Sequence, residues 1–112
     1  MAARKPRRSA VGFATAREIA LRLPDVEETT SYGTPALRAR KKLLARLHQD
    51  GEWLVVRCGL DARDALLRAK PESFLVTDHY RAHPYVLVRL GAVSRTDLTD
   101  VLKQAWRECH GG

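Results

Sequence analysis

The chain has 112 residues and a formal net charge of +7. Hydrophobic residues make up 45% and charged residues 29%, which is ordinary for a globular domain and argues against a wholly disordered chain. Two cysteines are too few for a disulfide framework, and no apolar run approaches the roughly 20 residues that cross a bilayer. We therefore expect a single soluble, cytoplasmic domain with one modest core.

Residues 1–13 form a basic segment whose composition differs from that of the rest of the chain. They contain no acidic residue and no apolar stretch of the kind that a signal peptide needs, so we predict a disordered basic arm followed by one domain over residues 14–110. The arm carries +4 of the net +7, which leaves +3 for the domain. It could wrap a nucleic-acid backbone or act only as a solubilising tail. Its cations are Arg4, Lys5, Arg7 and Arg8.

The first predicted element is a helix. Thr15 followed by Glu18 matches a capping box, an apolar face recurs at helical spacing, and Pro24 ends the helix. Residues 26–39 are rich in Thr, Gly and Pro, which predicts a strand interrupted by a bend, with Pro35 typical of an edge strand.

Two hairpins and two further helices follow. Apolar residues alternate over 43–48, and the Asp50-Gly51 pair separates this strand from a second one at 53–58. Asp61 begins a second helix that Pro71 closes. Residues 74–76 and 85–90 form another hairpin around the loop 78–84, and Ser94 starts a last helix with a broad apolar stripe. The order α-β-β-β-β-α-β-β-α predicts a two-layer α+β sandwich of three helices on an antiparallel sheet built from hairpins.

The chain contains LPDVEE, SYGTPA, the strand from Leu43 to Leu47, the pair His79-Tyr80 and then PYVLVRL. Together, and in this order from the first helix to Trp106, these segments resemble the MmcQ/YjbR family. The resemblance implies a compact YjbR or CyaY-like fold and a DNA-binding role. Relatives commonly have a glycine next to lysine in the turn near residue 40, where this chain has only cations and one alanine. The matching segments are 23–28, 31–36, 43–47, 79–80 and 84–90.

The same basic turn is the leading candidate site. Cations on a protruding hairpin can reach phosphates while the strands hold them in place, although such residues also protect exposed strand edges from pairing. The residues are Arg38, Arg40, Lys41, Lys42 and Arg46.

The loop 78–84 is a second candidate. Its histidines and arginine could serve a ligand, but a loop does not align the two rings as a helix would, so a structural role competes with a ligand pocket. Tyr32 and the Gly33-Thr34-Pro35 turn could add a recognition groove or serve only as turn and core. The candidate residues are Tyr32, His79, Tyr80, Arg81 and His83.

The function that these patterns favour is non-enzymatic binding of nucleic acid through phosphates, without sequence preference. We expect no catalytic residues, metal or cofactor, because close CxxC pairs, Gly-rich phosphate loops and GxSxG are missing. One alternative is a peptide- or protein-binding adaptor that adds a strand at residues 29–39, and another is a small-ligand domain at the loop 78–84. We expect a monomer, or a weak homodimer through the last helix and Trp106.

Overall fold

The computed structural model describes residues 11–31 and 33–111. In chain order these residues form α1 (Phe13–Leu21), β1 (Val26–Ser31), β2 (Thr34–Ala39), β3 (Lys42–Leu47), β4 (Trp53–Arg57), α2 (Leu60–Ala69), β5 (Phe74–Leu75), the 3₁₀ turn η2 (Asp78–Tyr80), β6 (Tyr85–Arg89) and α3 (Arg95–Gly111). The α+β class and the predicted order of helices and strands are confirmed. None of the helices in this described part is long and apolar enough to span a membrane.

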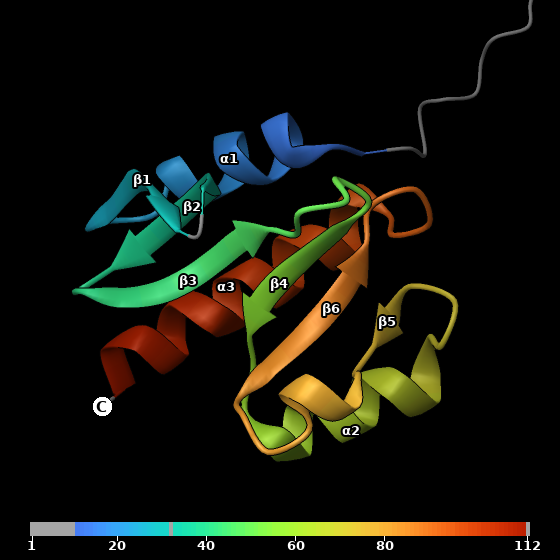
Figure 1. The fold of residues 1–112 in the computed structure, drawn as a ribbon. Coiled ribbons are helices and arrows are strands. Elements are labelled where there is room, and N and C mark those ends of the chain that lie inside the picture. Colours follow the sequence, from blue (N-terminus) through green and yellow to red (C-terminus); the bar gives the residue numbers. More distant parts are fainter. Residues whose placement is uncertain (1–10, 32, 112) are drawn as a thin grey trace, which may run out of the picture.

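The strands form one antiparallel sheet with the order β1-β2-β3-β4-β6-β5. Figure 1 shows α3 running behind β3 and β4, with α1 above it near β1 and β2. The short helix α2 lies by β5 and β6 at the far end of the sheet. Two helices thus cover one face of the sheet, and the opposite face of β3, β4 and β6 carries no helix.

The core lies between the sheet and α3. Leu54, Val56 and Val88 point to this side from the central strands, and Leu98 and Leu102 meet them from α3. All five side chains are fully buried. Each such aliphatic side chain stabilises the fold by about 1.5–3 kcal/mol relative to exposure, so this layer supplies much of the folding free energy.

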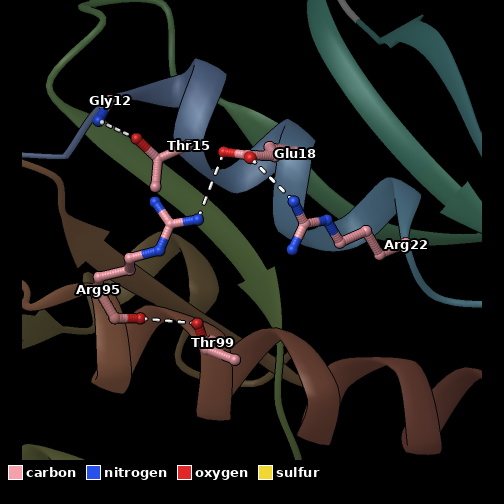
Figure 2. A network of polar contacts seen from close by, with 6 residues as sticks. All are labelled: Gly12, Thr15, Glu18, Arg22, Arg95 and Thr99. Carbon is pink, nitrogen blue, oxygen red and sulfur yellow. Dashed lines mark hydrogen bonds and ion pairs between the residues drawn. The ribbon is translucent and has the colours of Figure 1, made fainter.

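Charged contacts join α1 to α3 at the edge of this layer. Figure 2 shows the Glu18 carboxylate accepting hydrogen bonds from Arg22 at 3.2 Å and from Arg95 at 3.3 Å. The Thr15 hydroxyl accepts a hydrogen bond from the backbone N–H of Gly12 at 3.3 Å. Because these side chains are exposed, the links orient the two helices more than they stabilise them.

The start of α1 differs from the prediction. The helix begins at Phe13, with Gly12 as its N-cap, so the predicted capping box at Thr15 is wrong. Thr15 is the third residue of the helix, and its hydroxyl accepts a hydrogen bond from the Gly12 N–H instead. Val11 donates to the Leu90 carbonyl at 3.4 Å, so residues 11–13 belong to the fold and not to the predicted arm. The helix also ends at Leu21, before Pro24.

The segment 26–39 is a full hairpin, not one bent strand. Gly33 has a φ of +79°, which suits the turn between β1 and β2. β2 pairs on both sides, so the expectation that Pro35 marks an edge strand is wrong. Pairing with β3 begins only at Ala36, which places Pro35 where its missing N–H interrupts no contact with β3.

A bulge in β3 changes which side chains share a face. Leu37 faces Ala45 and Arg38 faces Leu43, which leaves Leu44 as an extra residue. Leu44 and Ala45 are both buried in the core, so the simple alternation predicted over residues 43–48 fails there. The bulge turns Leu43 to the face that carries no helix.

Candidate functional site

The helix-free side of the sheet, which we call the open face, is the main candidate surface. Directly opposed residues of antiparallel strands share a face, so the register assigns its members. They are Glu27, Thr29 and Ser31 on β1, Thr34, Ala36 and Arg38 on β2, Leu43 and Arg46 on β3, Trp53, Val55 and Arg57 on β4, Leu75 on β5, and Tyr85, Leu87 and Arg89 on β6.

The open face is basic. Four of its members are arginines, and Glu27 is the one acidic residue assigned to it. Within residues 11–31 and 33–111, Arg38, Arg57 and Arg89 form no ion pair, and the ion pairs present join other side chains. The open face therefore carries more positive than negative side chains, with Glu27 directly opposite Arg38.

Aromatic rings hold two of these arginines in place. The Arg89 guanidinium lies 4.4 Å from the ring centroid of Trp53, its direct partner across β4 and β6. The Arg57 guanidinium lies 5.2 Å from the ring centroid of Tyr85 and donates to its hydroxyl at 3.1 Å. Arg57 also donates to the Leu43 carbonyl at 2.7 Å. Cation–π stacking of this kind fixes a guanidinium while leaving donors available to a ligand.

A depression of about 480 Å³ opens on this face. Leu43 and Val55 form its apolar part. The Arg46 guanidinium is a polar part of the lining and donates to the Tyr80 hydroxyl at 2.7 Å. The volume falls in the range of small-ligand sites. The remaining lining residues are Gln49, His79, His83 and Tyr85.

Arg63 of α2 shapes the loop that borders the depression. Its side chain is buried, with 5% of its surface exposed. The Nη1 atom donates to the carbonyls of Tyr80, His83 and Tyr85 at 3.2, 2.9 and 3.1 Å, and Nη2 donates to that of Arg81 at 2.8 Å. One guanidinium thus replaces the backbone partners that an irregular loop lacks.

The hairpin tip between β2 and β3 has an unusual backbone. Arg40 and Lys41 form the two-residue turn, with φ of +54° and +70°. Both central residues of such a turn need left-handed backbone, which favours Asn and Gly and is strained for long side chains. The turn keeps its hairpin geometry without a glycine.

The five predicted residues of this tip do not form one cluster. Arg38 and Arg46 lie on the open face, and Arg40 and Lys41 are exposed at the turn itself. Lys42 lies directly opposite the buried Ala39 and therefore faces the helix side. The hairpin tip therefore extends the open face by Arg40 and Lys41, whereas Lys42 does not belong to it.

The other predicted residues have mixed outcomes. His79 and His83 are exposed and line the depression with Tyr80. Arg81 pairs with Asp78 at 3.3 Å and is not among the lining residues. In the part of the chain that the structure describes, no group of three or more His, Cys, Asp or Glu could hold a metal ion. Tyr32 and the arm cations Arg4, Lys5, Arg7 and Arg8 lie outside the described residues.

The two cysteines are buried free thiols. Burial raises the pKa of Cys58 to about 11, and the negative charge of Glu108 adds to the shift. Burial also raises the pKa of Cys109. A thiol with a raised pKa is a poor nucleophile at neutral pH, so both side chains act as small apolar groups.

The family model described as YjbR matches residues 21–108. The chain belongs to the YjbR family. The matched residues include every member of the open face, together with α2 and most of α3. No curated protein matches the sequence.

A solved structure has the same fold as this YjbR-family chain. It is the crystal structure of the Deinococcus radiodurans protein DR2400, family-model domain DUF419. The TM-score is 0.71 at 20% sequence identity, over 88% of this chain and 78% of that one. At this identity the likeness establishes the fold alone.

Sequence patterns alone missed several residues that define the surface of this YjbR-family chain. Trp53, Arg57 and Arg89 were not candidates, although alternation in two clear strands places them on one face. That signal was available. The role of Arg63 gave no signal, because an arginine within an amphipathic helix is normally solvated. The segment 29–39 offers a free edge only on β1, because β2 is paired on both sides.

Proposed function

We propose that this chain binds nucleic acid through the open face and catalyses no reaction. The observation that carries the proposal is the combination of four arginines with Trp53 and Tyr85 on a sheet face that no helix covers. Arginines supply phosphate contacts that do not depend on sequence, and aromatic rings supply stacking surfaces. The family membership supports the fold behind this surface but specifies no ligand.

The geometry favours this function over a peptide adaptor. A strand-adding peptide would pair with the edge strand β1, whose residues Glu27 and Glu28 are acidic and exposed. The positive groups lie instead on the face of the sheet, where phosphates can approach several arginines together.

The test measures binding of a fluorescent oligonucleotide by anisotropy at several salt concentrations. If the four open-face arginines contact phosphates, log K falls with log salt with a slope of about −3. The double variant Arg38→Gln and Arg89→Gln removes two contacts and should reduce the steepness by roughly 1.5. Removal of residues 1–10 should weaken binding further.

A matched control keeps the same change in net charge. Arg68→Gln with Arg107→Gln removes two exposed arginines from α2 and α3, away from the open face. We expect the control to bind with a slope close to that of the unmodified chain. Equal losses in both double variants would show that only net charge matters and would contradict the assignment to the open face.

A further inference from the structure

We infer that the depression on the open face takes a single unpaired nucleobase, so that the preferred ligand is single-stranded nucleic acid. The inference rests on the proposed function and names the form of nucleic acid. Arginines along a sheet would serve a duplex or a single strand equally well. The recess beside them distinguishes the two ligands.

The chemistry of the recess matches a flat ring with a polar edge. Its apolar part is the half-buried Leu43 together with Val55, which is 1% exposed, so Leu43 offers the contact surface for the face of an aromatic ligand. Arg46 and Gln49 bring hydrogen-bonding groups to the same space. Single-stranded recognition modules use this combination of ring contacts and edge contacts for unstacked bases.

The aromatic wall is preassembled. The Tyr80 and Tyr85 rings lie 6.1 Å apart between centroids at 72°, and His79 meets Tyr80 edge-on at 4.8 Å. Arg46 holds the Tyr80 hydroxyl, and Arg63 holds the Tyr80 backbone carbonyl. Because the wall is fixed from both sides, a base would enter without first ordering the loop.

The flanking charges fit a strand that continues past this base. Arg57 stacks on Tyr85 at the border of the depression, so a phosphate next to the bound base meets a fixed guanidinium. A base within a duplex would have to be unstacked and unpaired to enter the depression, which disfavours duplex binding. A single strand has no such barrier.

The experiment compares three probes of equal length on the full chain: single-stranded oligothymidylate, the same backbone with abasic sites, and a duplex. We expect the oligothymidylate to bind roughly fivefold or more tightly than the abasic strand, as expected for one stacked base. The variant Gln49→Ala with His79→Ala alters two exposed lining residues and should reduce this difference without changing abasic binding.

The outcomes separate this inference from the proposed function. Equal binding of the abasic strand and oligothymidylate would overturn the base pocket and leave phosphate binding intact. Tighter binding of the duplex would also overturn it. A free nucleoside monophosphate that binds as tightly as the strand would refute the strand assignment, because flanking arginines would then contribute nothing. No binding of any probe would overturn both proposals.

Discussion

Replacement of Arg63 by Met should destabilise the fold strongly, because it removes a buried guanidinium. The substitution keeps an unbranched apolar stem in α2 and removes the guanidinium that bonds to four backbone carbonyls between Tyr80 and Tyr85. Hydrogen bonds from a charged donor contribute about 1.5–3 kcal/mol each when water cannot replace them.

The net effect is smaller than the sum of four such bonds. Arg81 and His83 are exposed, so their carbonyls can regain water, whereas Tyr80 and Tyr85 are half-buried. The variant also escapes the desolvation of a buried cation. A buried acceptor left without a donor costs about 1–3 kcal/mol, so the two half-buried carbonyls lead us to expect a loss of about 2–4 kcal/mol for Arg63→Met.

Urea unfolding followed by circular dichroism measures the loss. The matched control is Arg68→Met, which changes an exposed arginine of the same helix and should shift stability by less than about 0.5 kcal/mol. Hydrogen exchange adds a local readout, because the His83 N–H donates to the Tyr80 carbonyl at 2.9 Å and should lose protection. A loss below about 1 kcal/mol for Arg63→Met would refute the role assigned to this residue.

Three further predictions concern other parts of the fold. Arg40→Asn with Lys41→Gly relieves the left-handed turn and should raise stability by about 1–2 kcal/mol, read as a higher Tm; an unchanged or lower Tm would contradict the strain. The raised pKa of Cys58 means that the folded state keeps its thiol proton while the unfolded chain loses it above about pH 9, so stability should fall by roughly 2 kcal/mol by pH 11. Cys58→Ala should flatten that alkaline fall in urea titrations, and an equal fall in both proteins would count against the shift. Glu18→Gln breaks the exposed links to Arg22 and Arg95 and should reduce the free energy of unfolding by less than about 1 kcal/mol; a much larger loss would show that this pair is structural.

The order of helices and strands could be predicted, because the spacing of hydrophobic residues and the turn-forming residues determine each element from neighbouring positions alone. Asp50-Gly51 marks the β3–β4 turn, where Gly51 has a φ of +78°. Ser94 accepts a hydrogen bond from the Asp97 N–H at 3.0 Å, as the N-cap of the last helix should. Each of these features depends on a few neighbouring residues, so the local sequence is enough to predict it.

Strand faces were harder to predict, because one extra residue reverses them. The bulge at Leu44 places two successive side chains in the core and turns Leu43 outward. Pairing with the buried Ala39 puts Lys42 on the helix side, so the five predicted cations do not share one surface. No local pattern in residues 38–46 specifies where a bulge falls, since the pairing partner decides it.

The candidate surface depends on contacts between distant segments. Arg46 meets Tyr80 and Arg57 meets Tyr85, at sequence separations of 34 and 28 residues. The sequence contained both the basic strand and the aromatic loop as separate candidates. Only the strand order, which places β6 beside β4, brings them together on one face.

The most direct test of the account uses the two tryptophan side chains as reporters in one NMR titration with oligothymidylate. Trp53 lies on the open face beneath Arg89, whereas the Trp106 indole donates to the Pro24 carbonyl at 2.7 Å on the helix side. We expect the indole N–H signal of Trp53 to shift progressively with added ligand and that of Trp106 to stay in place. A shift of Trp106 with an unchanged Trp53 signal would contradict binding at the open face.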